Sequence, residues 1–348
     1  MSIWTNIKQS LVRFIPSHVN DPVGLIRRML TSEKKAAPFT LWLTGVSILA
    51  MPIDWLMQRI EPGTRSKLDR EAPGPHIFIC GPARSGTTLV YQVLSDNLNV
   101  AYVRNFTVAF SRSSLLASRL FTRNTNKVRT TQYENYYGKT AGMQAPSEAN
   151  HLWNQWVGVD AADFRTKLSP EGAVAMADFF NSFSAMEGKP TLSKNNNVNA
   201  FAEEVSQSLD NSYFICMRRE TKFLAQSLLQ ARLEINGNIE QSYGVIDTKK
   251  AHASGTCKVD PVDQVLDQVE YLNQLAEDQQ TRIGSDRFWL VDYEAFCNDP
   301  AALIERVKSD ILNTSHVDVD YSIPEITANN RVTNKAIFKR IEDALQRR

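Results

Sequence analysis

The fold is decided by residues 76–95, which read HIFICGPARSGTTLVYQVLS. Residues 77–80 are a short apolar run of the kind that is buried in a parallel sheet. Gly81 and Gly86 bound the loop that follows, and apolar residues then recur at helical spacing over residues 89–94. The sequence therefore predicts a buried strand, a glycine-bounded loop and a helix that begins near Gly86.

The beginning of this helix predicts a binding site for an anion. The first amides of a helix have no partner within the helix, and they carry the positive end of its dipole. We expect these N–H groups and the neighbouring side chains to hold a phosphate-like group. The candidate residues are Arg84, Ser85, Gly86, Thr87 and Thr88.

The positions of Gly81, Gly86 and Thr88 fit the ATP-binding Walker pattern G-x-x-x-x-G-K-[ST], but Thr87 stands where the lysine should be. The basic residue is Arg84, inside the loop. This difference argues against a nucleoside-phosphate kinase or NTPase, which stays as an alternative together with a non-catalytic nucleotide-binding scaffold.

The loop 82–88, Pro-Ala-Arg-Ser-Gly-Thr-Thr, resembles the 5′-phosphosulfate loop of sulfotransferases that use 3′-phosphoadenosine-5′-phosphosulfate (PAPS). The usual form is P-[RK]-S-G-T-[TS], from which one inserted alanine, Ala83, departs. The resemblance implies transfer of the sulfuryl group from PAPS to an acceptor hydroxyl by in-line displacement, with adenosine 3′,5′-bisphosphate as product. It covers about residues 76–310.

A second basic turn supports this resemblance. A strand predicted at 213–217 ends in Arg218 and Arg219, and Ser227 follows Arg219 by eight residues. In the bacterial-type and tyrosylprotein-type sulfotransferases, an arginine and a serine at this spacing bind the 3′-phosphate of PAPS. Arg219 would offer a charged fork to that phosphate, and Ser227 a hydroxyl. The family's Asp-Pro/Gly is Glu220-Thr221 here.

Lys194, at the end of a strand predicted at 191–194, resembles the family's lysine that touches the transferring sulfonate. Cations that face oxygens on which charge develops stabilise such a transition state. The residues after Lys194 differ from the family's pattern, since Asn195 and Asn196 stand there. Such a transfer requires no metal, and the sequence has no cluster of metal ligands.

Glu148 and His151 are the candidates for the general base. The tyrosylprotein-type enzymes have a glutamate shortly after the second strand, whereas the matching residues 103–106 contain no acid. Glu148 and His151 lie in a helix predicted at 145–156, and a carboxylate or a neutral imidazole there could take the acceptor's proton. The alternative is that Glu148 caps the helix and His151 packs.

Strands and helices alternate along the rest of the chain, which predicts an α/β fold. We expect a P-loop-like doubly wound parallel sheet flanked by helices, with ligands at the carboxyl ends of the strands. The further strands are predicted at 99–103 and 287–292, and the main helices at 169–184, 199–209, 223–233, 262–283 and 293–307. Residues 73–348 would form the catalytic domain. Arg331 lies in a basic segment that many sulfotransferases fold over the nucleotide.

Residues 1–72 predict a helical N-terminal extension. The run 38–53 is uncharged and follows Lys34 and Lys35, but a spanning helix needs about 20 apolar residues. Three interpretations stay open, namely a buried or dimer-forming hairpin, attachment to a membrane interface, and a span. Residues 61–75, with Pro62 and Gly63, would be a linker. We expect a cytoplasmic protein, with membrane association through residues 38–58 and a homodimer both left open.

Composition narrows the partners of the protein. Lys plus Arg (39) and Asp plus Glu (38) nearly cancel over the 348 residues, so the overall charge does not suggest nucleic-acid binding. The acceptor hydroxyl cannot be read from the sequence. A carbohydrate, a lipid, a small metabolite and a protein tyrosine all remain candidates.

Overall fold

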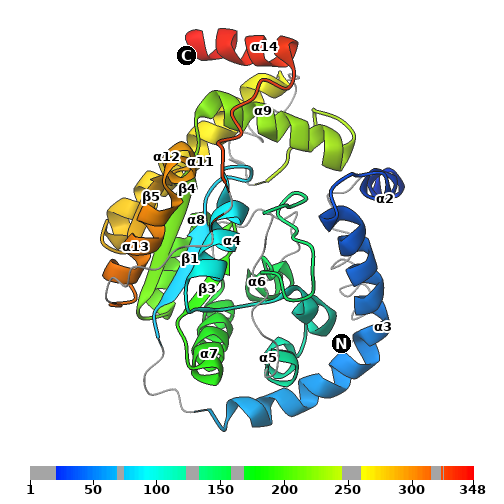
Figure 1. Ribbon diagram of the computed structural model, residues 1–348, viewed down its shortest axis with the longest axis vertical. Helices are drawn as coiled ribbons and strands as arrows, with labels where there is room; N and C mark the ends of the chain where they lie inside the picture. The colour runs from blue at the N-terminus through cyan, green and yellow to red at the C-terminus, as the bar shows by residue number, and fades with distance from the viewer. Residues whose placement is uncertain are drawn as a thin grey trace.

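The computed structural model describes residues 21–68, 74–122, 133–157, 168–244, 260–314, 323 and 325–348. Its centre is a five-stranded sheet in the order β2-β3-β1-β4-β5 (Figure 1). The strands are β1 His76–Cys80, β2 Ala101–Tyr102, β3 Thr191–Lys194, β4 Ser212–Arg218 and β5 Phe288–Asp292. Each pairing of neighbouring strands is parallel. The predicted α/β fold with a parallel sheet is confirmed.

Helices cover both faces of the sheet (Figure 1). One face packs against α4 Thr87–Asn97, α12 Tyr293–Asn298 and α13 Pro300–Asp310. The other packs against α6 Asn150–Val157, α7 Pro170–Glu187, α8 Val198–Ser208 and α11 Pro261–Ile283. Alternate residues of β1 serve the two cores, with Ile77 and Ile79 on the α4 side and Phe78 and Cys80 on the α7 side. This two-sided burial explains why β1 is apolar throughout.

The sheet register places the candidate site residues together at the carboxyl ends of β1, β3 and β4. Ile79 of β1 pairs with Lys194 of β3 and with Ile215 of β4. Because the strands are parallel, the loop after β1, Lys194 and the turn after β4 meet where these strands end. The sheet therefore assembles the three basic features that the sequence identified separately.

The remaining described elements surround this core. They are α2 Pro22–Leu30, α3 Ala36–Arg65, η1 Asn105–Phe110, α5 Ser114–Thr122, α9 Thr221–Ala231, η2 Arg232–Asn236 and α14 Lys335–Gln346. The C-terminal helix α14 packs on α9 and α11 through residues that include Ile341 and Ala344 (Figure 1).

The N-terminal region departs from two of our expectations. Residues 36–65 form one 30-residue helix, α3, which curves along one side of the molecule (Figure 1). The hairpin, one of the three interpretations left open for residues 38–53, is therefore wrong. The linker expected from residue 61 is also wrong in its first part, because the helix continues through Pro62 and Gly63 to Arg65.

Contacts with the catalytic domain explain why α3 continues. Its Asp54 carboxylate accepts hydrogen bonds from the N–H groups of Arg112 and Ser113 and from the Ser113 hydroxyl. Two turns further on, Glu61 accepts from the N–H groups of Leu115 and Leu116. Both carboxylates thus satisfy amides at the beginning of α5, where the helix dipole favours negative charge.

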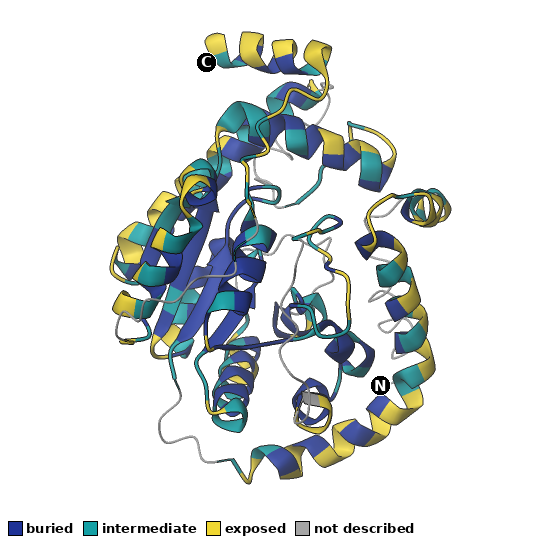
Figure 2. Ribbon diagram, in the orientation of Figure 1, coloured by how far each residue is buried: buried dark blue, intermediate teal, exposed yellow. Residues whose placement is uncertain are grey.

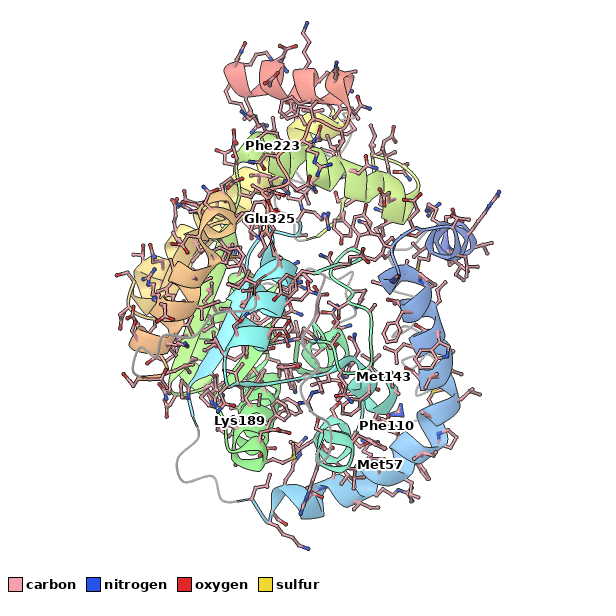
Figure 3. All side chains as sticks on the ribbon, in the orientation of Figure 1. Met57, Phe110, Met143, Lys189, Phe223 and Glu325 are labelled. Carbon is pink, nitrogen blue, oxygen red and sulfur yellow. The ribbon has the colours of Figure 1, made fainter. Side chains whose placement is uncertain are left out.

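Apolar packing and an ion pair complete this attachment. Met57 of α3 packs with a cluster that includes Phe110 and Met143, all three of which are labelled in Figure 3. Near the end of the helix, Arg65 contacts Glu61 and also Asp178 of α7. These tertiary contacts hold α3 along its length against the domain.

Helix α6 is shorter than the sequence predicted. It begins at Asn150, not in the first turn expected at Pro146. Pro146 instead forms an antiparallel bridge with Arg104, and the N–H of Ser147 donates to the carbonyl of Val103. Glu148 therefore lies before α6 and not within it, so its predicted position in this helix is wrong.

One expectation concerns residues outside the described ranges, because residues 1–20 of the helical extension expected over residues 1–72 are not described. Residues 123–132 and 245–259 are not described either. Tyr133, Asn135, Tyr137 and Tyr243 lie at the cavity described next.

Candidate active site

Two glycines let the loop after β1 approach its neighbours closely. Gly81 has φ +125°, and a Cβ there would lie 2.5 Å from the carbonyl oxygen of Met217 on β4. Gly86 has φ +94°, and its Cβ would lie 2.3 Å from Cδ2 of Tyr293. Only glycine combines this backbone conformation with such close contacts. The loop is therefore built around Gly81 and Gly86, as the sequence predicted.

The loop is tightened by its own hydrogen bonds. The hydroxyl of the buried Ser85 donates to the carbonyl oxygen of Pro82 at 2.7 Å. Arg84 adopts φ +73°, a conformation that residues with side chains adopt rarely. The Ser85 hydroxyl therefore stabilises the turn.

The beginning of α4 offers unpaired amides at the cavity. Gly86 is the N-cap, it makes no side-chain capping bond, and the first turn contains no acid. The Thr87 hydroxyl donates to the Asn196 amide oxygen at 3.0 Å. Gly86, Thr87 and Thr88 all line the cavity. A helix N-terminus with free amides and no acidic residue suits an anionic ligand.

Arg84 stands between the other two predicted contact residues. Its Nε donates to the Ser227 hydroxyl at 3.2 Å, and its main-chain carbonyl accepts from Nη1 of Arg219 at 3.0 Å. Two guanidinium groups therefore lie at one end of the cavity, one from the loop after β1 and one from the turn after β4. The predicted meeting of Arg84, Arg219 and Ser227 occurs in the structure.

Tyr293, at the beginning of α12, holds this end of the site together. Its ring packs on Gly86, the Arg219 guanidinium lies 4.9 Å from the ring centroid, and its hydroxyl accepts from the N–H of Asn329 at 3.1 Å. Arg219 in turn donates to the Asn329 carbonyl and, at 3.5 Å, to the side chain of Asn330. The C-terminal segment is thus bound to the arginine turn through residues 329 and 330.

Lys194 and Glu148 form an ion pair inside the cavity wall. The Lys194 ammonium contacts Oε1 of Glu148, and the Lys194 side chain is 1% exposed. Oε2 of Glu148 accepts from the Asn150 amide at 3.1 Å. Gly138 packs directly on this carboxylate, because a Cβ at Gly138 would lie 2.4 Å from Oε1. The carboxylate is therefore fixed on three sides.

Burial and nearby cations disfavour the charged form of Lys194. Desolvation is the largest cause, and the charges of Lys139 and Arg84 add to it, so the pKa of Lys194 falls to about 7. The Glu148 carboxylate acts in the opposite direction by contact with the ammonium. An anion that entered beside Lys194 would favour the ammonium further.

These groups converge on one cavity of about 290 Å³. It is lined by the loop, Lys194, Glu148 and Arg219, and by four tyrosines. The tyrosines are Tyr133, Tyr137, Tyr243 and Tyr293. The Arg84 guanidinium lies over the ring of Tyr137, 4.8 Å from the ring centroid. Among the described residues, no group of three or more His, Cys, Asp or Glu could hold a metal ion.

Four predicted residues, Ser85, Ser227, His151 and Arg331, are not among those that line the cavity. Ser85 holds the loop, and Ser227 accepts from Arg84. His151 lies on α6, and its Nε2 is 3.2 Å from the Ser114 hydroxyl on α5. Arg331 is exposed, and its carbonyl accepts from Gln226 at 2.8 Å. Glu148, in contrast, lines the cavity. A base role for His151 and a nucleotide contact for Arg331 stay predictions.

Sequence reasoning missed several residues of the wall. Tyr293 is not among the predicted site residues, because its contact with Gly86 is made between segments far apart in the chain and has no local signal in the sequence. Asn196 was identified only as a departure from the usual residue after Lys194. Its position two residues beyond the end of β3 could have indicated it, because parallel strands deliver such residues to one edge.

Comparisons with known proteins agree with this geometry. A model of the sulfotransferase family matches residues 75–310. The fold is similar to the crystal structure of sulfotransferase STF1 from Mycobacterium tuberculosis H37Rv, with a TM-score of 0.50 and 12% identity over 91% of both chains. It is also similar to sulfotransferase STF9 from Mycobacterium avium, with a TM-score of 0.50 and 12% identity over 99% of this chain and 88% of that one. A search of curated proteins gives no significant match. Because the family model covers well over half of the sequence, this chain belongs to the sulfotransferase family.

Proposed function

We propose that this protein transfers the sulfuryl group of PAPS to an acceptor hydroxyl by in-line displacement. The observation that carries the proposal is the convergence of Arg84, Arg219 and Lys194 on one cavity beside the open N-terminus of α4. Three cations and a set of free amides match a donor that carries phosphates at one end and a sulfonate at the other.

The residues at the arginine end of the cavity fit the nucleotide. Nε of Arg219 is buried and has no hydrogen-bond partner among the described residues, so a charged donor is left for a ligand. Arg84 and Ser227 lie next to it. We assign the 3′-phosphate to Arg219 and Ser227, and the 5′-phosphosulfate to Arg84 and residues 85–88.

Lys194 and Glu148 would act at the transferring group. The donor supplies the sulfuryl group, whose oxygens compete with Glu148 for the Lys194 ammonium. Glu148, released from that ion pair, would take the proton of the acceptor hydroxyl while the hydroxyl oxygen bonds to sulfur. The bond from sulfur to the phosphate oxygen breaks at the same time, and the leaving bisphosphate stays neutralised by Arg84 and Arg219.

A titration of thermal stability tests the donor. A ligand bound only by the folded protein raises its unfolding temperature with concentration. We expect adenosine 3′,5′-bisphosphate to stabilise the protein at concentrations where ATP with Mg²⁺ does not. Stabilisation by ATP and Mg²⁺ alone would replace the proposal by a kinase or NTPase, and no response to either would leave a scaffold.

A transfer assay tests the reaction itself. Radiolabelled PAPS is incubated with the protein and with hydroxyl-bearing candidates from the carbohydrate, lipid, metabolite and tyrosyl-peptide classes. Label that moves to one class identifies the acceptor. Donor binding without transfer to any class would remove the catalytic part of the proposal.

A further inference from the structure

The outer side of α2 and α3 carries most of the exposed apolar surface in the described part of the chain. Ten of the fifteen large exposed hydrophobic side chains lie on these two helices. On α3 they are Trp42, Ile48, Leu49, Ile53, Trp55, Leu56 and Ile60, which we call the α3 apolar face. Leu49 is 81% exposed. Figure 2 shows exposed residues along the outer side of this curved helix. Apolar patches of this kind mark interaction sites.

The one acidic residue in the first two thirds of α3 lies on its buried side, so the exposed side has no acid there. Asp54 is the only charged residue between positions 36 and 58, and it is buried against α5. At 3.6 residues per turn, Leu49 and Leu56 lie on the opposite side of the helix from Asp54. The apolar face is therefore uncharged over roughly 30 Å.

The ends of the face are basic. Over residues 21–68 the exposed charged residues are Asp21, Arg27, Glu33, Lys34, Lys35, Arg59 and Lys67, five cations and two acids. Of these, Lys34 lies over the ring of Tyr137, on the side of the cavity. Arg59 also lies over the ring of Trp55, 3.6 Å from its centroid. Cations and tryptophans beside an apolar helical face are typical of a helix that lies in a bilayer interface.

We infer that the α3 apolar face docks on the surface of an anionic lipid bilayer, with α3 lying in the plane of the membrane. By length and composition α3 is the one described helix that could cross a membrane. However, Asp54, Glu61 and Arg65 bind it to α5 and α7 along its second half. The helix therefore presents one face to the lipid and keeps the other on the domain.

Charge favours a bilayer over a second copy of the chain. In an antiparallel pairing of two α3 helices, the Lys35 end of one would meet the Arg59 end of the other, and in a parallel pairing Lys35 would meet Lys35. Like charges would meet in both arrangements, at a cost. Anionic headgroups neutralise both ends at once, because the negative surface of such a bilayer attracts basic residues that lie close to it.

Sedimentation with lipid vesicles tests the inference on the full chain. We expect binding to vesicles that contain phosphatidylglycerol and phosphatidylcholine, weaker binding to phosphatidylcholine alone, and a loss with added salt because the charges are screened. The double variant Leu49→Glu/Leu56→Glu should bind the anionic vesicles at least about tenfold more weakly, because it places carboxylates at the apolar contact.

The control is Val174→Glu, which places one carboxylate, against the two of the double variant, at a 72% exposed apolar position on α7, a helix that is not part of the α3 apolar face. It should bind vesicles like the unaltered protein, and both variants should keep its unfolding temperature, since all three positions are exposed. Equal loss in the control would overturn the inference, as would no binding of the unaltered protein. A lipid-free dimer that only Leu49→Glu/Leu56→Glu converts to monomer would also overturn it, in favour of a second copy.

Discussion

Nη1 of Arg219 donates a hydrogen bond to the main-chain carbonyl of Arg84 at 3.0 Å, which joins the turn after β4 to the loop after β1. The bond brings the two arginine residues together although 135 residues separate them in the chain. Arg219 thus has two functions, since it holds the loop and also keeps Nε free for a ligand.

Replacing Arg219 should therefore weaken donor binding. Arg219→Ala removes charge-assisted hydrogen bonds worth about 1.5–3 kcal/mol each, so affinity for adenosine 3′,5′-bisphosphate should fall about 10- to 100-fold or more. Isothermal calorimetry measures the change. The adjacent Arg218 provides the control, because it pairs with Glu277 and Asp292 and does not line the cavity. Equal loss with Arg218→Ala would show a general charge effect.

Glu148 and His151 can be separated by their effects on turnover. Glu148→Gln removes the carboxylate in the cavity and should lower kcat about 10²- to 10⁴-fold with little change in affinity for the bisphosphate. His151→Asn should leave kcat near that of the unaltered protein, because His151 faces Ser114 and lies outside the cavity wall. The reverse pattern would make His151 the base.

Gly138 tests whether the position of the Glu148 carboxylate matters. Gly138→Ala should lower kcat, since its Cβ would lie 2.4 Å from Oε1 of Glu148. Gly142→Ala is the control. Its φ of +100° resembles the +88° of Gly138, but its Cβ would meet nothing closer than the Cβ of Ala145, at 3.9 Å.

In both variants the free energy of unfolding should fall by a similar amount, about 1–2 kcal/mol, because an alanine is strained at this positive φ. Parallel urea titrations and rate measurements compare them. If kcat falls equally in both, the loss comes from loop strain and not from the carboxylate.

His76, at the beginning of β1, predicts a pH dependence of stability. Its Nδ1 lies 2.8 Å from the Thr191 hydroxyl and its Nε2 3.2 Å from Oδ1 of Asn181, and burial lowers the pKa of His76 from 6.5 to about 4. Between these two values the unfolded chain binds more protons than the folded one. The contribution to stability is therefore complete above pH 6.5 and is lost as the pH falls toward 4.

The loss amounts to about 3 kcal/mol at most. Urea unfolding of the unaltered protein and of His76→Gln, at neutral pH and near pH 4.5, measures it. We expect the difference in unfolding free energy between the two proteins to shrink at the lower pH. A constant difference would show that His76 does not titrate in this range.

The strands and helices of the catalytic domain were predictable because their signals are local. Strand β3 was predicted with its observed bounds, Thr191–Lys194, and α11 was expected at 262–283 and occupies Pro261–Ile283. Apolar periodicity marks such segments, and glycine or proline marks their ends. The same reasoning failed at Pro62 and Pro146, where contacts with α5 and with the segment after β2 override the local preference.

The sequence by itself determined the parallel sheet and the glycine-bounded loop after β1, because a buried strand, Gly81, Gly86 and a helix beginning at Thr87 need only neighbouring residues to specify them. Only the tertiary structure brought Glu148 to Lys194 across 46 residues and Tyr293 onto Gly86. Such contacts depend on where distant segments meet in space, and no periodicity or spacing along the chain encodes that meeting.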